Sequence, residues 1–168
     1  MTKKPRPQRR GNWKTPKAGW DEAEVVPSET EPVVKRTVEW KSRLVDYLAW
    51  SVGQKFVYGQ FDCALFTFQA VKVMTGFDPG GPFRGQYENL YDGIALLREA
   101  GFRDHVDICA RYFNDIPPSF AQAGDIAVVP GEDGPALGLV QGEFIYALLP
   151  TGMALVPLLS ALRAFRVA

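Results

Sequence analysis

Hydrophobic positions follow a helical period in the first half of this chain. Between residues 40 and 51, apolar side chains recur every three or four residues, which predicts an amphipathic helix that ends before Gly53. A second helix is predicted after Asp62, an expected N-cap, and it ends at Gly76, a typical C-terminal stop. A third helix is predicted from about residue 87 to residue 100, after a loop rich in glycine and proline.

The pattern changes after the two consecutive prolines at positions 117 and 118. Short apolar runs separated by turn residues then predict strands at residues 125–129, 136–140, 144–148, 154–157 and 164–167. The first four form an expected antiparallel meander, and a short helical turn is expected just before the last strand. Because helices come first and strands follow without alternation, the sequence predicts an α+β domain in which the second helix packs on one face of the sheet. The strand side chains expected to be buried against that helix are Ile126, Val128, Leu137 and Leu139.

Charge divides the chain into an N-terminal arm and a folded body. Residues 1–20 contain seven Lys or Arg and no acid, whereas the next eleven residues contain five acids and no base. Several prolines and few aliphatic residues leave this part unable to fold alone, so we expect an extended arm over residues 1–36 and a folded domain over residues 37–168. Aromatic side chains are frequent interface anchors, which makes Trp13 and Trp20 candidates for anchoring the arm to a partner. A flexible solubilising tail is the alternative interpretation.

Composition disfavours several classes of partner. Basic residues near tryptophan are also typical of nucleic-acid binding, but residues 32–168 hold twelve basic and fourteen acidic side chains and provide no second basic face. We therefore do not expect a nucleic-acid partner. The basic N-terminus is not followed by an apolar stretch, and no run reaches membrane-spanning length. The sequence thus predicts no signal peptide, no membrane span and folding in a reducing cytoplasm.

Two cysteines and one histidine limit the possible site chemistry. Cys63 and Cys109 lie far apart without a paired spacing, and His105 is the single imidazole of the chain. Neither a disulfide framework nor a metal site is predicted, and no cofactor is expected. A Cys63–Cys109 bridge is an alternative to two free thiols, each of which is also consistent with a small buried apolar residue. We expect His105 to be exposed in a charged connection between the third helix and the prolines.

Two residue pairs mark the starts of predicted elements. Asp62 and Cys63 open the second helix, and Gly124 and Asp125 open the first strand of the meander. In their order and spacing, these pairs resemble motifs of the NlpC-type cell-wall peptidases, a superfamily of papain-like cysteine hydrolases, over residues 37–167. The resemblance implies a papain-like NlpC-type fold, with N-terminal helices packed on a small antiparallel β-sheet or barrel. It also implies that Cys63 occupies the position of the nucleophile.

The third motif departs from the family at its catalytic base. Residues 136–140 fit the pattern of the next strand, but Ala136 stands where the family has histidine, and Tyr146 lies at about the place of the polar third residue. In a Cys/His pair the imidazole takes the thiol proton and later protonates the leaving amine. Alanine can do neither, so we expect Cys63 to be a remnant nucleophile. Among NlpC-type proteins, a phage-associated subgroup of small tail proteins shows the same departure.

Three functions remain open on this resemblance. The first is a structural component of a phage tail or tail tip, made in the host cytoplasm and incorporated into the virion, with the arm joining neighbouring tail proteins. The second is an active cysteine peptidase or amidase that cleaves peptidoglycan stem peptides during DNA entry, using Cys63 with an unconventional base such as His105. The third is a cytoplasmic binding module or tail-assembly factor.

Overall fold

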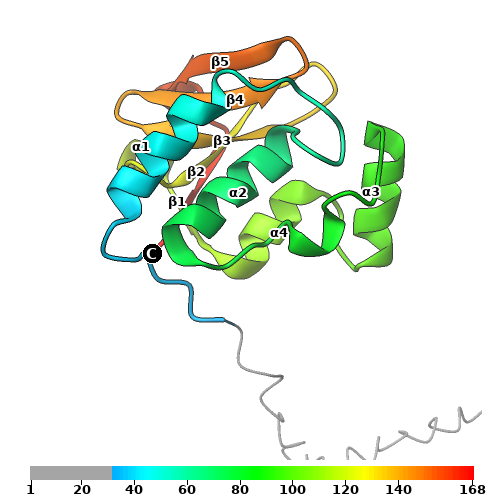
Figure 1. Cartoon of the computed structure of the whole chain (residues 1–168), viewed down its shortest axis with the longest axis horizontal. Coiled ribbons are helices and arrows are strands. Elements are labelled where there is room, and N and C mark those ends of the chain that lie inside the picture. The colour runs from blue at the N-terminus through cyan, green and yellow to red at the C-terminus, as the bar shows by residue number, and fades with distance from the viewer. Residues whose placement is uncertain (1–31) are drawn as a thin grey trace, which may run out of the picture. The chain divides into compact units, whose positions relative to one another are not determined.

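Four α-helices precede the sheet in the part of the chain that the structure describes. The computed structural model describes residues 32–168, and the predictions for the arm that involve Trp13 and Trp20 lie outside this range. The helices are α1 (Trp40–Ser51), α2 (Cys63–Thr75), α3 (Leu90–Glu99) and α4 (His105–Tyr112) (Figure 1). The positions of α1 and α2 confirm the first two predicted helices.

Capping residues explain where α2 and α3 begin and end. The Asp62 carboxylate accepts a hydrogen bond from the Leu65 amide at 3.0 Å, and Gly76 ends α2 in the left-handed conformation with φ of 81°. Both agree with the predicted boundaries. α3 begins three residues later than predicted, because the Asn89 side chain accepts from the Asp92 amide and so caps the helix at that point.

The sequence prediction missed α4, which occupies the segment expected to be a charged connection. The Asp104 carboxylate accepts from the Asp107 amide at 2.9 Å and caps this helix of eight residues. Two turns give too few apolar positions for a convincing helical period. As a result, His105 is the first residue of a helix rather than part of an irregular loop.

A six-stranded antiparallel sheet follows the helices. Its strands are β1 (Asn114–Ile116), β2 (Ile126–Val129), β3 (Ala136–Gln141), β4 (Phe144–Leu149), β5 (Gly152–Pro157) and β6 (Arg163–Arg166), in the spatial order β1-β6-β2-β3-β4-β5. Strands β2 to β5 form the predicted meander, and β6 returns to pair with β2. Short 3₁₀ helices lie at Gly81–Phe83, Pro118–Phe120 and Leu158–Ser160. The sequence missed β1, because three residues with two polar side chains carry no strand pattern.

Alternate residues of the central strands are buried on opposite faces of the sheet. Ile126, Val128, Leu137 and Leu139 belong to one core cluster with Phe66 of α2, which confirms the predicted strand register. The second cluster lies on the other face and consists largely of small side chains, among them Ala127, Ala136 and Ala164. In Figure 1, α1 and α2 lie across one face of the sheet. The fold class is therefore α+β, as predicted.

Asp125 joins both ends of the described chain through a buried cluster. Its carboxylate is fully buried and lies 2.8 Å from the guanidinium of Arg36 and 3.0 Å from that of Arg166 on β6. It also accepts backbone N–H bonds from Gln122 at 2.9 Å and Val167 at 3.1 Å. Arg36, which the sequence assigned to the end of the arm, thus contributes to the folded body. The Gly-Asp pair has a structural role here, because each carboxylate oxygen has both a cationic and a backbone partner.

Within residues 32–168, no helix is both long enough and apolar enough to cross a membrane. The backbone amides just before α1 are attached to the body: the Arg36 amide donates to the carbonyl of Ala168 and the Thr37 amide to that of Met74. The two ends of the described part therefore meet beside Asp125, which pairs with Arg36 and accepts from the Val167 amide.

Candidate functional site

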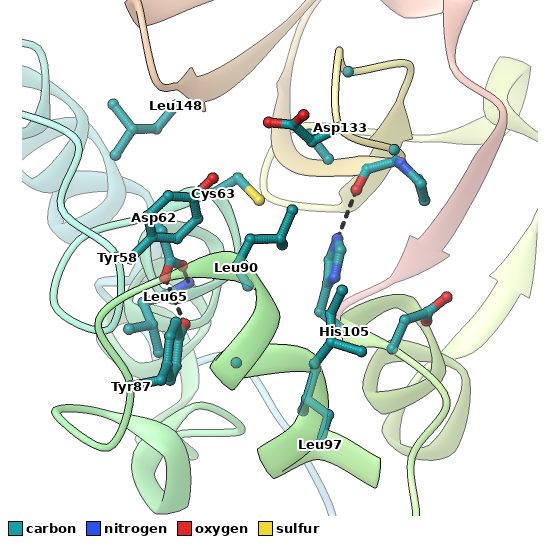
Figure 2. A pocket seen from close by; sticks show the side chains of 18 of the residues that line it. Tyr58, Asp62, Cys63, Leu65, Tyr87, Leu90, Leu97, His105, Asp133 and Leu148 are labelled. Carbon is teal, nitrogen blue, oxygen red and sulfur yellow. Dashed lines mark hydrogen bonds between the residues drawn. The ribbon is translucent and has the colours of Figure 1, made fainter.

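A cavity of about 400 Å³ lies at the N-terminal end of α2 (Figure 2). Residues from α2, α3, α4 and the loops that follow β2 and β4 form its walls. Among the polar lining residues are Tyr58, Asp62, Cys63, Tyr87, His105 and Asp133. The cavity thus collects the thiol of the predicted nucleophile and the single imidazole, which the sequence did not place together.

Cys63 is a protonated thiol at neutral pH. Its side chain is partly buried at the first position of α2, and burial raises its pKa to about 11. A hydrogen bond with the backbone of Leu137 lowers this pKa, and the neighbouring Asp62 raises it, but both effects are smaller than that of burial. A position at a helix N-terminus favours the thiolate. Here that effect does not overcome the cost of placing a negative charge in an apolar site.

Both carboxylate oxygens of Asp62 accept hydrogen bonds that hold the start of α2 and the loops around it. One carboxylate oxygen caps α2 through Leu65, and the other accepts from the Gly59 amide at 3.0 Å and from the Tyr87 hydroxyl. Gly59 has φ of 75°, and a Cβ there would lie 1.8 Å from the carbonyl oxygen of Tyr87, so only glycine fits. These bonds hold the loop that contains Tyr87 against the start of α2. They support the interpretation of Asp62 as a helix cap rather than an acid catalyst.

Ala136, the residue that the sequence resemblance sets against the histidine of NlpC-type peptidases, lines the same cavity as Cys63. Ala136 is the first residue of β3 and is only 6% exposed, and it lines the cavity together with Cys63. Cys63 packs against the core cluster that contains Ala136, and its thiol bonds to the backbone of the next residue, Leu137. The pairing of β3 with β4 explains why the same strand has glycine at position 138. A Cβ at Gly138 would lie 2.6 Å from the Tyr146 carbonyl oxygen.

His105 is not exposed, which corrects the sequence prediction. The ring is partly buried at the start of α4 and lines the same cavity as Cys63, and its Nε2 lies 2.8 Å from the carbonyl oxygen of Pro135 (Figure 2). That bond requires a proton on Nε2. Burial lowers the pKa of His105, and the bond to Pro135 opposes this shift only in part. The imidazole is therefore neutral at pH 7. The Asp-x-x-Asp spacing of residues 104–107 was the sequence signal for the helix that places it here.

The remaining candidates do not line the cavity that contains the Cys63 thiol. Tyr146 on β4 pairs with Leu139 and packs on the core cluster below the helices, and it is not among the residues that line the cavity. Cys63 and Cys109 are both free thiols, so the alternative of a bridge between them is not realised. Cys109 is fully buried, as expected for a small apolar residue, and burial raises its pKa. No group of three His, Cys, Asp or Glu side chains within residues 32–168 is arranged to hold a metal ion.

The match to a known family covers nearly all of the described chain. Residues 35–167 match a family described as a domain of unknown function, DUF6950. The chain belongs to this family. No curated protein matches the sequence. The DUF6950 domain of this chain begins one residue before Arg36, so it includes both partners of the Arg36–Asp125 ion pair as well as the cavity and its thiol.

Proposed function

We propose that this DUF6950 domain is a non-catalytic relative of the NlpC-type papain-like peptidases and a structural component of a phage tail or tail tip. In this proposal the protein is made in the host cytoplasm and enters the virion, and its N-terminal arm binds neighbouring tail proteins through Trp13 and Trp20. Support for the papain-like relationship comes from the order of Asp62-Cys63, the Gly-Asp pair and the strand that begins at Ala136, together with the α+β architecture.

One observation carries the loss of catalysis: the thiol of Cys63 is protonated and has a methyl-bearing residue, Ala136, in the expected position of its base. A thiol with a pKa of about 11 is less than about 0.1% thiolate at pH 7, so the nucleophile is scarce. General acid–base catalysis typically contributes about 10²–10⁴-fold to the rate. An amide leaving group would also lack the acid that protonates it.

A peptidase or amidase that uses His105 is the second candidate function. The observation that favours it is the shared cavity, since His105 is neutral and lines the same space as Cys63. With the proton held on Nε2 by Pro135, Nδ1 is the nitrogen free to accept a proton. In this mechanism Nδ1 would take the Cys63 proton and return it to the leaving amine of a peptidoglycan stem peptide. The third possibility, a tail-assembly factor, has no observation of its own.

The test compares the full-length chain with Cys63→Ala and His105→Gln on purified peptidoglycan. We expect none of the three proteins to release cross-linked stem peptides above the background without protein, as measured by mass spectrometry of the soluble products. Release by the unmodified chain that Cys63→Ala abolishes would overturn the non-catalytic proposal. If His105→Gln also abolished it, the second candidate would replace the first.

A further inference from the structure

The cavity beside Cys63 offers a mainly apolar surface that the proposed function does not yet use. From α2 it is lined by Leu65 and Phe68, and from α3 by Leu90, Ile94 and Leu97. Its volume of about 400 Å³ lies in the range of pockets that enclose a ligand. In Figure 2 the Leu90 side chain and the Cys63 sulfur point into this space.

α3 forms one wall of the cavity. Gly93 is its only buried residue, and a Cβ there would lie 3.0 Å from the Tyr87 ring. The helix therefore packs closely against Tyr87 at this point. Leu90 and Ile94 on the same helix are only partly buried and line the cavity. Apolar side chains that face open space lack the stabilisation that burial gives. An apolar group that entered the cavity would be buried there and would also shield Leu90 and Ile94 from water.

The rim of the cavity is acidic. Glu132 and Asp133 lie on the turn between β2 and β3, both are exposed, and neither takes part in an ion pair within residues 32–168. With Asp62 and Asp104, the lining contains four carboxylates. Of the two arginines there, Arg103 is paired with an aspartate of α4 at 3.0 Å, which leaves Arg98 as the remaining cation. The negative charges therefore outnumber the positive ones around the opening.

This combination fits a basic, apolar peptide better than the substrate of the related peptidases. Peptidoglycan stem peptides carry carboxylates, which Glu132 and Asp133 would repel. A large apolar side chain between basic residues would place its body against Leu90 and Ile94 and its charges at the rim. We propose that the cavity binds, without cleaving it, a segment of another virion protein in which a large apolar side chain is flanked by Lys or Arg. This inference rests on the proposed function, which supplies the protein partner and the absence of cleavage.

Three capped pentapeptides test the proposal in methyl NMR titrations of the full-length chain. The first has a central leucine flanked by lysines, the second has the same leucine flanked by glutamates, and the third has a central serine flanked by lysines. We expect the first peptide to shift the methyl signals of Leu90, Ile94 and Leu97 at the lowest concentration, and the serine peptide to leave them unshifted. Because each exposed ion pair contributes little, the glutamate peptide should bind about three- to tenfold more weakly. Equal binding of all three peptides, or no shift of the cavity methyls, would overturn the proposal.

Two pairs of variants separate the apolar walls from the charged rim. The double variant Glu132→Lys with Asp133→Lys should reverse the preference between the lysine and glutamate peptides. Its control is Glu88→Lys with Glu99→Lys, which makes the same charge change at exposed positions outside the cavity. The control should keep the original preference. Ile94→Gln should abolish binding of the leucine peptide. Its control on the same helix is Tyr91→Gln, at a position that is 84% exposed and does not line the cavity.

The titrations also distinguish a failure of this inference from a failure of the proposed function on which it rests. Mass spectrometry of each sample detects any new peptide end. Cleavage that depends on Cys63 would overturn the proposed loss of catalysis, and with it the non-catalytic binding proposed here. An intact peptide that fails to shift the cavity methyls would overturn only the inference about the cavity. If the charge-reversed variant kept the original preference, the acidic rim would have no role in recognition.

Discussion

At the scale of single residues, the chemistry of this protein depends on how two titratable side chains are buried. Cys63 and His105 line one cavity, but the apolar surroundings keep the thiol protonated and the imidazole neutral. In an active Cys/His pair the imidazole takes the proton of the thiol. Here each group is stabilised in its uncharged form by its own environment, and this difference leads to two measurable consequences.

The first consequence concerns the reactivity of Cys63. Because its pKa is about 11, alkylation by iodoacetamide should be slower at pH 8 than that of a free cysteine peptide and should still accelerate above pH 9. Intact-mass measurements should show a single adduct, which Cys63→Ala removes and Cys109→Ala leaves in place, since Cys109 is fully buried. Rapid alkylation at pH 6 to 7 would instead reveal a thiolate.

The second consequence is a pH dependence of stability that His105 controls. Its pKa lies below the ordinary value of about 6.5 in the folded chain, so between the two pKa values the unfolded chain binds a proton that the folded chain does not. The free energy of unfolding should therefore fall as the pH drops through about 6.5. His105→Gln keeps a donor for Pro135 but cannot titrate. Urea unfolding at pH values from 7.5 to 5 should show that the free energy of unfolding falls less for this variant than for the original chain. An equal fall in the two proteins would show that His105 does not cause the pH dependence.

At the scale of elements, Asp125 determines how the ends of the domain are joined. It connects the segment before α1 with β6 through Arg36 and Arg166. Breaking a buried ion pair by removing one partner typically costs about 3–5 kcal/mol, because the other charge is left without compensation. We expect Asp125→Asn to lower the free energy of unfolding by this amount in urea.

The matched control for that variant is Asp115→Asn. Asp115 pairs with Arg163 between β1 and β6, but both side chains are about half exposed. Exposed pairs contribute about 0–1 kcal/mol, so this variant should unfold almost like the original chain. Similar losses in the two variants would show that burial of Asp125 is not what makes its ion pairs important.

At the scale of the whole molecule, the boundary between arm and body can be tested by truncation. Deleting residues 1–31 leaves Arg36 in place, so the shortened chain should unfold cooperatively at nearly the original temperature in calorimetry. Deleting residues 1–36 also removes a partner of Asp125 and should lower the melting temperature by several degrees. Equal melting of the two truncated chains would show that Arg36 is dispensable for the fold.

The same truncation tests the proposed place of the protein in a virion. If the arm binds neighbouring tail proteins, the chain without residues 1–31 should stay folded but no longer enter assembled particles. Trp13→Ala or Trp20→Ala should weaken incorporation more than any single Lys→Ala in the arm, since buried aromatic side chains dominate interface energies. Incorporation that survives the deletion would place the decisive contacts on the body.

The sequence by itself determined the α+β order of elements, because that information is local. Asp62 and Gly76 mark the two ends of α2 through capping, and alternation along β2 and β3 separates the side chains that pack with α2 from those on the other face. Where the pattern was too short to repeat, as in β1 and α4, local reasoning failed. Ala136, on which the proposed loss of catalysis depends, can also be read directly from the chain.

Only the tertiary structure decided the environment of each functional group. The pKa of Cys63 depends on burial against residues more than seventy positions away, and Asp125 became a structural residue because Arg36 and Arg166 meet at its carboxylate. His105 reached the cavity because α4 carries it to Pro135, thirty residues later in the chain. Burial and charge pairing arise from contacts between distant segments. No periodicity or spacing along the sequence encodes them directly.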